Sequence, residues 1–238
     1  MASESIILYD LGNPAGRPVS PYGWRVRESL HLLGIPFEVR LLGFGEIRRH
    51  LPGQHTTVPV IIDGGETVGD SWEIARFLSA RRDPGGLLFG GANGFPLAEF
   101  VTCWVDATLM ARVNRMIIKD VHDDMAKDDR LEFRTGREKR FGTTLEQMQS
   151  SRESERPAFQ TLLHPSRRLI KRSPFLGGER PTYADFALHS MFVWARAVSR
   201  FELLRADDGL HGWIERMDEW LGPALNPGLE EVRRRCSA

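Results

Sequence analysis

The chain has 238 residues, and 41% of them are hydrophobic, which is typical of a globular protein with one large domain or two of ordinary size. Lysine and arginine together number 32, as do aspartate and glutamate, so no net charge favours nucleic acid or anionic lipid as a partner. No uninterrupted apolar segment approaches the roughly 20 residues that cross a bilayer.

The N-terminal residues MASESIILYD contain no basic region and only a short apolar run, so we expect no secretory signal peptide. Cys103 and Cys236 are the two cysteines. They are too few for a disulfide framework and too far apart for a zinc pair. We therefore expect a cytosolic protein.

Residues 1–86 predict a small α/β domain. The apolar run at 5–11 is typical of a strand, and the helix predicted after it has an apolar face formed by Tyr22, Val26, Leu30 and Leu33. The alternating residues 36–42 predict a second strand, parallel to the first because a helix intervenes. An Asp-Gly turn then indicates an antiparallel hairpin, followed by a helix that Ser71 caps.

Strand patterns disappear after the segment 81–96, whose glycines and prolines cannot continue a helix. Residues 95–238 are expected to form an all-helical domain, with helical patterns at 97–122, 141–152, 158–171, 183–199 and 210–221. Within this part, Thr182 and Asp185 match the capping box that begins a helix.

The segment SPYGWR at 20–25 places Ser20 at a helix N-cap and Pro21 at the first helical position. Free backbone N–H groups and the helix dipole favour an anion at such an end. A hydroxyl there can donate to a thiolate and lower its pKa. Serine is also a common N-cap, so a purely structural cap is the alternative.

Two further segments are candidates to hold a ligand. Val58 precedes Pro59 at the mouth of a strand, and its restricted backbone leaves its N–H and C=O free for an extended, peptide-like ligand. A proline with only a geometric role is the alternative, and a cis bond would favour function. Asp70 and Ser71 lie at another helix N-terminus, which suits a ligand carboxylate on the N–H groups and an ammonium on Asp70. An ordinary serine cap would look the same.

The predicted order of elements brings these three segments to one edge of the sheet, where ligands of α/β proteins bind. Together with VPVIIDGG, GDSWEIARFL and FLGGERPTYADFAL, SPYGWR makes the chain resemble the glutathione transferases. The resemblance implies a thioredoxin-like glutathione-binding domain followed by an all-α C-terminal domain. SPYGWR, VPV followed by DSW, and VHDD through GREKRFG are similar to the etherase-like group of bacterial β-aryl-etherases and their fungal relatives.

The resemblance implies a role for each matching residue. Ser20 would stabilise the glutathione thiolate, Val58, held by Pro59, would pair with the cysteinyl backbone, and Asp70 with Ser71 would hold the γ-glutamyl end. The polar residue that meets the glycyl carboxylate is Gln54 or His55. Glutathione is thus the implied co-substrate, and the implied partners are a hydrophobic small molecule and a second copy of the chain in a homodimer.

Tyr9, at the end of the first strand, is the rival activating group, because some transferases use a tyrosine there. The long loop after Tyr9 and the intact serine segment favour Ser20. No cysteine occupies the start of the first helix, so disulfide-exchange chemistry lacks its nucleophile.

Other segments are expected to be structural. VHDDMAKDD at 121–129 has no spacing that suits a metal and is expected to be solvated, as are REKR at 137–140 and RRRCSA at 233–238. Cys103 is expected to be a buried small hydrophobe. The core is expected to take up most of the tryptophans and methionines at helical spacing, with some lining an apolar pocket, among them Trp104, Met110, Met191 and Trp194.

We therefore expect a glutathione transferase whose thiolate attacks an apolar, aromatic electrophile, with aryl ether cleavage as one reaction. A carrier that binds hydrophobic molecules without turnover is the alternative. A scaffold that has lost the thiol site is a third hypothesis, and the intact SPY, VP and DS segments argue against it.

Overall fold

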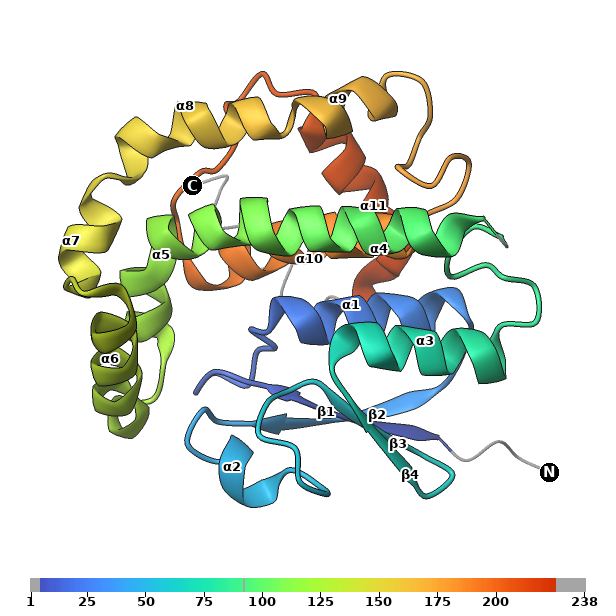
Figure 1. Ribbon diagram of the computed structural model, residues 1–238, viewed down its shortest axis with the longest axis horizontal. Helices are drawn as coiled ribbons and strands as arrows, with labels where there is room; N and C mark the ends of the chain where they lie inside the picture. The colour runs from blue at the N-terminus through green and yellow to red at the C-terminus, as the bar shows by residue number, and fades with distance from the viewer. Residues whose placement is uncertain (1–4, 92, 226–238) are drawn as a thin grey trace.

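The computed structural model describes residues 5–91 and 93–225 (Figure 1). Its first part holds a sheet in the order β2-β1-β3-β4, in which β1 and β2 are parallel and β3 is antiparallel to β1 and β4. The elements are β1 (Ile6–Leu11), α1 (Pro21–Leu32), β2 (Phe37–Leu42), α2 (Ile47–His50), β3 (Val60–Asp63), β4 (Glu66–Gly69) and α3 (Ser71–Arg82). The predicted thioredoxin-like order is confirmed, with the short α2 added in a connection.

Helices α1 and α3 cover one face of the sheet, and α2 lies on the other side (Figure 1). Ile6 and Leu8 of β1 are fully buried and belong to the same apolar cluster as Leu30 of α1 and Leu78 of α3. Because successive strand residues point to opposite faces, Tyr9 lies on the face away from α1, where it is half-buried.

The remaining part is helical, and residues 93–225 contain no strand. Its helix α10 packs against α1, α4 and α5, and every residue of α10 from Phe186 to Ala195 is buried. The elements are α4 (Gly94–Trp104), a π-helical turn η1 (Val105–Met110), α5 (Ala111–Asp124), α6 (Lys127–Phe141), α7 (Leu145–Ser150), α8 (Arg152–Leu162), α9 (His164–Ile170), α10 (Tyr183–Val198) and α11 (Leu210–Leu225). The predicted fold class, an α/β thioredoxin-like domain followed by an all-α domain, is confirmed.

The predicted capping box at the start of α10 is present. The buried Asp185 carboxylate accepts a hydrogen bond from the Thr182 N–H at 3.0 Å and others from the N–H groups of Leu176 and Gly177 and the indole of Trp213. The connection between α9 and α10, and α11 through Trp213, are therefore fixed to the start of the central helix.

Polar contacts join α1 to the helical part. The guanidinium of Arg25 is fully buried and makes a two-point ion pair with Asp106 of η1, with one N–O distance of 3.0 Å, and its Nε donates to the Ser190 hydroxyl. The imidazole of His189 lies 2.8 Å from the Glu28 carboxylate. These contacts fix the helix that begins after Ser20.

Three expectations about local structure are wrong. Helix α6 was not predicted, because its sequence KDDRLEFRTGREKRF buries only Phe133 and so carries almost no apolar period. Cys103 is exposed rather than buried. The cap of α3 is Asp70, not Ser71, because the Asp70 carboxylate reaches the N–H groups of Trp72 and Glu73. Separately, none of the helices in the described ranges is long and apolar enough to cross a membrane.

Candidate functional site

Ser20 caps α1 and faces a cavity. Its backbone is extended, and its hydroxyl oxygen accepts a hydrogen bond from the Gly23 N–H at 3.1 Å. Only 4% of the residue is exposed, and it lines a cavity of about 880 Å³. The hydroxyl proton has no acceptor among the described residues. Ser20 is therefore a cap that can still donate a hydrogen bond to a bound group.

The start of α1 is pressed against the end of β1. A Cβ on Gly23 would overlap the carboxylate of Asp10, which is fully buried, accepts from the Leu11 N–H at 2.8 Å and pairs with Arg27 at 3.1 Å. Burial raises the pKa of Asp10, against the opposing effect of Arg27. This close approach sets where Ser20 lies relative to the sheet.

Val58 lines the same cavity as Ser20. The Val58–Pro59 peptide bond is cis, and the Val58 N–H and C=O have no partner within the described part of the chain. Both groups are thus available to an extended ligand, as expected. Pro59 is buried and directly precedes β3.

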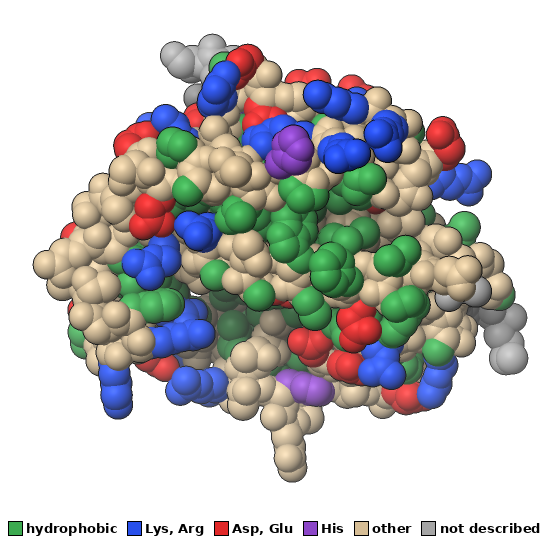
Figure 2. All heavy atoms as spheres, turned by 45° about the horizontal axis from the view of Figure 1, so that its top comes forward, with side chains coloured by type: hydrophobic (Ala, Val, Ile, Leu, Met, Phe, Trp, Pro, Cys, Tyr) green, Lys and Arg blue, Asp and Glu red, His purple; other side chains and the backbone are tan. Residues whose placement is uncertain are grey.

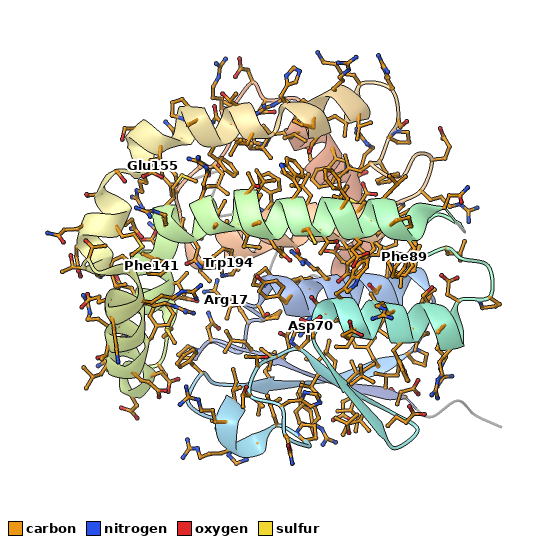
Figure 3. The ribbon with its side chains drawn as sticks, viewed as in Figure 1. Arg17, Asp70, Phe89, Phe141, Glu155 and Trp194 are labelled. Carbon is orange, nitrogen blue, oxygen red and sulfur yellow. The ribbon has the colours of Figure 1, made fainter. Side chains whose placement is uncertain are left out.

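Asp70 begins α3 on the same side of the molecule as the start of α1 (Figures 1 and 3). One carboxylate oxygen, Oδ1, accepts from the Trp72 N–H at 2.9 Å and the Glu73 N–H at 3.2 Å. Its φ of 71° is unusual for a residue other than glycine, and such strain is concentrated at functional sites. Asp70 is exposed, and its second oxygen, Oδ2, accepts no protein hydrogen bond in the described structure.

Ser71 is buried, and its carbonyl oxygen accepts from the Tyr183 hydroxyl at 2.9 Å. Gln54 is exposed, while His55 is half-buried with its ring against Gly69, where a Cβ would overlap it. None of Asp70, Ser71, Gln54 and His55 lines the cavity. Of the predicted site residues, the structure therefore brings Ser20 and Val58 together around one cavity.

Tyr9 is not among the residues that line this cavity. Its hydroxyl oxygen accepts from the Arg40 guanidinium at 3.0 Å, across the β1–β2 pair, on the sheet face away from α1. The structure thus places the rival tyrosine and Ser20 in different surroundings.

The apolar pattern predicts that Tyr22 lies on the buried face of its helix, but 36% of the residue is exposed and it lines the cavity. The Arg25 guanidinium lies 4.9 Å from its ring centroid. Burial and the nearby Asp106 raise the pKa of Tyr22, so its hydroxyl is protonated at neutral pH. The sequence feature that could have indicated Tyr22 as a site residue is its position two residues after Ser20.

The opposite wall of the cavity comes largely from the helical part. Its apolar residues include Met110, Val121, Met125, Phe133, Trp194 and Val198, with Phe44 from the connection after β2. Met110 and Trp194 confirm the expectation that some of these side chains line an apolar pocket. Figure 2 shows the hollow, with hydrophobic side chains in its floor and Lys or Arg beside it, and Figure 3 shows Trp194 and Arg17 near it.

The segment VHDDMAKDD is only partly solvated, contrary to our expectation: His122 is buried, whereas Asp123 and Lys127 are exposed. Asp123 pairs with Lys119 and His122, and Asp124 binds Asn13 at 2.9 Å and Arg17 at 3.3 Å. No group of metal-binding side chains occurs among the described residues. The last segment expected to be exposed, RRRCSA, lies outside the described residues, as does Cys236.

Residues 15–85 match the N-terminal domain family of glutathione S-transferases, and residues 96–220 match the C-terminal domain family. Glutathione transferase GSTFuA3 of Phanerochaete chrysosporium has a similar structure, with a TM-score of 0.79 and 22% identity over 93% of this chain and 98% of that one. CsGST63524 of Ceriporiopsis subvermispora, solved in complex with glutathione, has a TM-score of 0.70 and 20% identity over 96% and 98%.

The chain is thus a two-part protein with a thioredoxin-like sheet, a helical bundle and a cavity at their junction. It belongs to the glutathione S-transferase family, as the two family matches show. Glutathione, the predicted co-substrate, is the ligand in the Ceriporiopsis subvermispora complex.

Proposed function

We propose that the protein is a serine-type glutathione transferase of the etherase-like group, in which Ser20 stabilises the thiolate of bound glutathione. The unused hydroxyl proton of Ser20 in the cavity wall carries the proposal. Lowering a thiol pKa by one unit requires about 1.4 kcal/mol. A hydrogen bond to a charged group contributes about 1.5–3 kcal/mol, and the α1 dipole adds to it.

The rest of glutathione would bind along the edge formed by β3, β4 and the start of α3. The free backbone groups of Val58 support pairing with the cysteinyl residue, with Pro59 fixing the turn. The free oxygen of Asp70 suits the γ-glutamyl ammonium, beside Ser71. The glycyl carboxylate would meet Gln54 or His55.

The bound thiolate would attack an electrophilic carbon of an apolar, aromatic substrate in the cavity. With a β-aryl ether, the new C–S bond forms as the C–O bond breaks, and the departing aryloxide takes a proton from water. The aromatic and methionine side chains of the opposite wall support such a substrate, because they bury its apolar area.

We further propose that residues 1–86 bind glutathione and residues 95–238 bind the second substrate, in a cytosolic homodimer. Leu97 and Phe100 of α4 are 67% and 71% exposed, and hydrophobic side chains gather on the face seen in Figure 2. Such a patch supports an interface. Analytical sedimentation should give a mass twice the 27.0 kDa of one chain, and Phe100→Asp should shift the protein towards the monomer.

The test of the Ser20 assignment is the ionisation of bound glutathione. We expect the thiolate absorbance of the complex to titrate at least one pH unit higher in Ser20→Ala than in the wild type, with glutathione affinity nearly unchanged. Ser20→Thr keeps a hydroxyl at the cap and is the matched control. A Ser20→Ala complex that titrates like the wild type would show that another group stabilises the thiolate.

A non-catalytic carrier is the second candidate, favoured by the apolar walls and the size of the cavity, about 880 Å³. Steady-state assays with an aryl halide and a model β-aryl ether separate the two functions. A carrier would bind both compounds and convert neither.

A further inference from the structure

Arg137 of α6 is a cation in the cavity wall, and it has no anionic partner in the part of the chain that the structure describes. It lines the cavity and is half-buried. Within the described residues its guanidinium contacts only an aromatic ring, with 5.1 Å between its Cζ and the Phe133 centroid. Burial, together with repulsion from Arg140, lowers the pKa of Arg137. We expect the whole segment REKR to be exposed, but its first residue, Arg137, lies in the cavity wall.

The carboxylates around the same cavity are engaged elsewhere, Asp128 excepted. Asp128 is exposed. The others are held by backbone N–H groups, by the Asn13 amide or by basic side chains other than Arg137: Glu46 by Gly43 N–H, Asp129 by Gly45 N–H, Glu132 by Arg48, and Asp124 by Asn13 and Arg17. Of the carboxylates that the structure describes, none therefore pairs with Arg137.

A partly buried charge without a partner is unfavourable, and pairing removes that cost. Guanidinium groups bind carboxylates through two parallel hydrogen bonds. The neighbouring walls, formed by Phe44, Phe133 and Trp194, are aromatic. A ligand that fits all of these groups has an aromatic body and one carboxylate.

We propose that Arg137 binds the carboxylate of an aromatic acid in this cavity, so that the second substrate is an aromatic carboxylate. The identification as a substrate rests on the proposed transferase activity, whereas the binding of the acid does not. Arg137 acts here as a specificity-determining residue.

The test is calorimetric titration at pH 7, without glutathione, using biphenyl-4-carboxylate and the neutral biphenyl-4-carboxamide of the same shape. We expect the wild-type protein to bind the acid at least about tenfold more tightly than the amide, a difference of about 1.4 kcal/mol. Arg137→Gln should bind the two compounds equally. Arg137→Lys should keep part of the preference, because it retains the charge but not the two-point geometry.

Arg140→Gln is the matched control, since Arg140 lies one turn further along α6 and is exposed, and it should keep the wild-type preference. Equal binding of acid and amide by the wild type would overturn the inference, as would a preference that survives in Arg137→Gln. Loss of glutathione affinity in Arg137→Gln would also overturn it by assigning Arg137 to the glutathione site. If the preference holds but no electrophile is converted, the aromatic-acid site stands and the transferase proposal fails.

Discussion

The carbonyl oxygen of Pro59 accepts a hydrogen bond from the backbone N–H of Asp70 at 3.2 Å. This bond joins two segments that lie at the two ends of the β3–β4 hairpin, one with the free backbone groups of Val58 and the other with the free carboxylate oxygen of Asp70. Two proposed contacts of glutathione are thus held at a fixed separation before any ligand binds, which favours affinity because less ordering is needed.

Asp70 has a structural and a proposed binding role that substitution can separate. Asp70→Asn should keep the helix cap and tolerate the positive φ, so the free energy of unfolding should change by less than about 0.5 kcal/mol. It removes the charge, and we expect glutathione KM to rise about tenfold. Asp70→Ala should raise KM similarly and also lose at least about 1 kcal/mol of stability. Chemical denaturation and steady-state kinetics measure both. A normal KM in Asp70→Asn would exclude the proposed ammonium contact.

Tyr9→Phe should change kcat/KM by no more than about twofold. Losing about 1.4 kcal/mol of transition-state stabilisation would change it about tenfold. The reason is that the Tyr9 hydroxyl binds Arg40 on the sheet face away from α1. The measurement is kcat/KM with an aryl halide, beside Ser20→Ala. Full activity in Ser20→Ala with loss in Tyr9→Phe would reverse our assignment.

Two glycine-to-alanine substitutions in helices should have opposite effects on stability. A Cβ on Gly23 meets the Asp10 carboxylate, whereas a Cβ on Gly136 of α6 meets open space. Gly23→Ala should therefore lower the free energy of unfolding by about 1–3 kcal/mol through overpacking. Gly136→Ala should raise it by up to about 1 kcal/mol through helix propensity. Urea unfolding of the two variants checks the pair, and equal effects would contradict the packing described at the start of α1.

The buried His189 should make stability depend on pH. Burial opposes its charge, but the Glu28 and Asp218 carboxylates outweigh burial and raise its pKa to about 9, above the usual 6.5. Arg196 also pairs with Asp218. Because the folded state holds this proton more tightly, the stabilisation is complete below pH 6.5 and is lost as pH rises through about 9, by up to about 3 kcal/mol.

Urea unfolding between pH 6 and 9.5 measures this loss. The double variant Glu28→Gln/His189→Gln removes both charges of the pair, and its stability should vary less over that interval. His164→Gln, at an exposed histidine, is the control and should keep the wild-type slope. An unchanged slope in the double variant would show that His189 does not hold the extra proton.

The sequence was most informative where a local rule decides the structure. The apolar residues of β1, the Ser20–Pro21 pair, the Asp-Gly hairpin and the capping box of Thr182 and Asp185 each act over a few residues. They predicted the α/β order, the helical second part and the cap at Ser20. These features follow from backbone geometry and short-range hydrogen bonds, so neighbouring residues suffice to indicate them.

The sequence could not predict features that depend on contacts between distant residues. Helix α6 buries only Phe133, so its sequence shows almost no apolar period. Its position, and that of Arg137 in the cavity wall, depend on the packing of Phe133 against α5, α7 and Phe44. Asp70 rather than Ser71 caps α3, and this depends on the positive φ of Asp70. The residue type alone does not indicate that backbone conformation.

The sequence by itself determined the fold class, the family resemblance and the hydroxyl at the start of α1. It also predicted that Ser20 and Val58 would meet at one edge of the sheet. Tertiary structure alone decided that Tyr9 faces away from α1, and that no carboxylate within residues 5–91 and 93–225 pairs with Arg137. The physical reason is that burial and charge pairing depend on contacts between residues far apart in the sequence. Ser20 and Arg137, for example, line the same cavity. Strand and helix patterns, in contrast, are local.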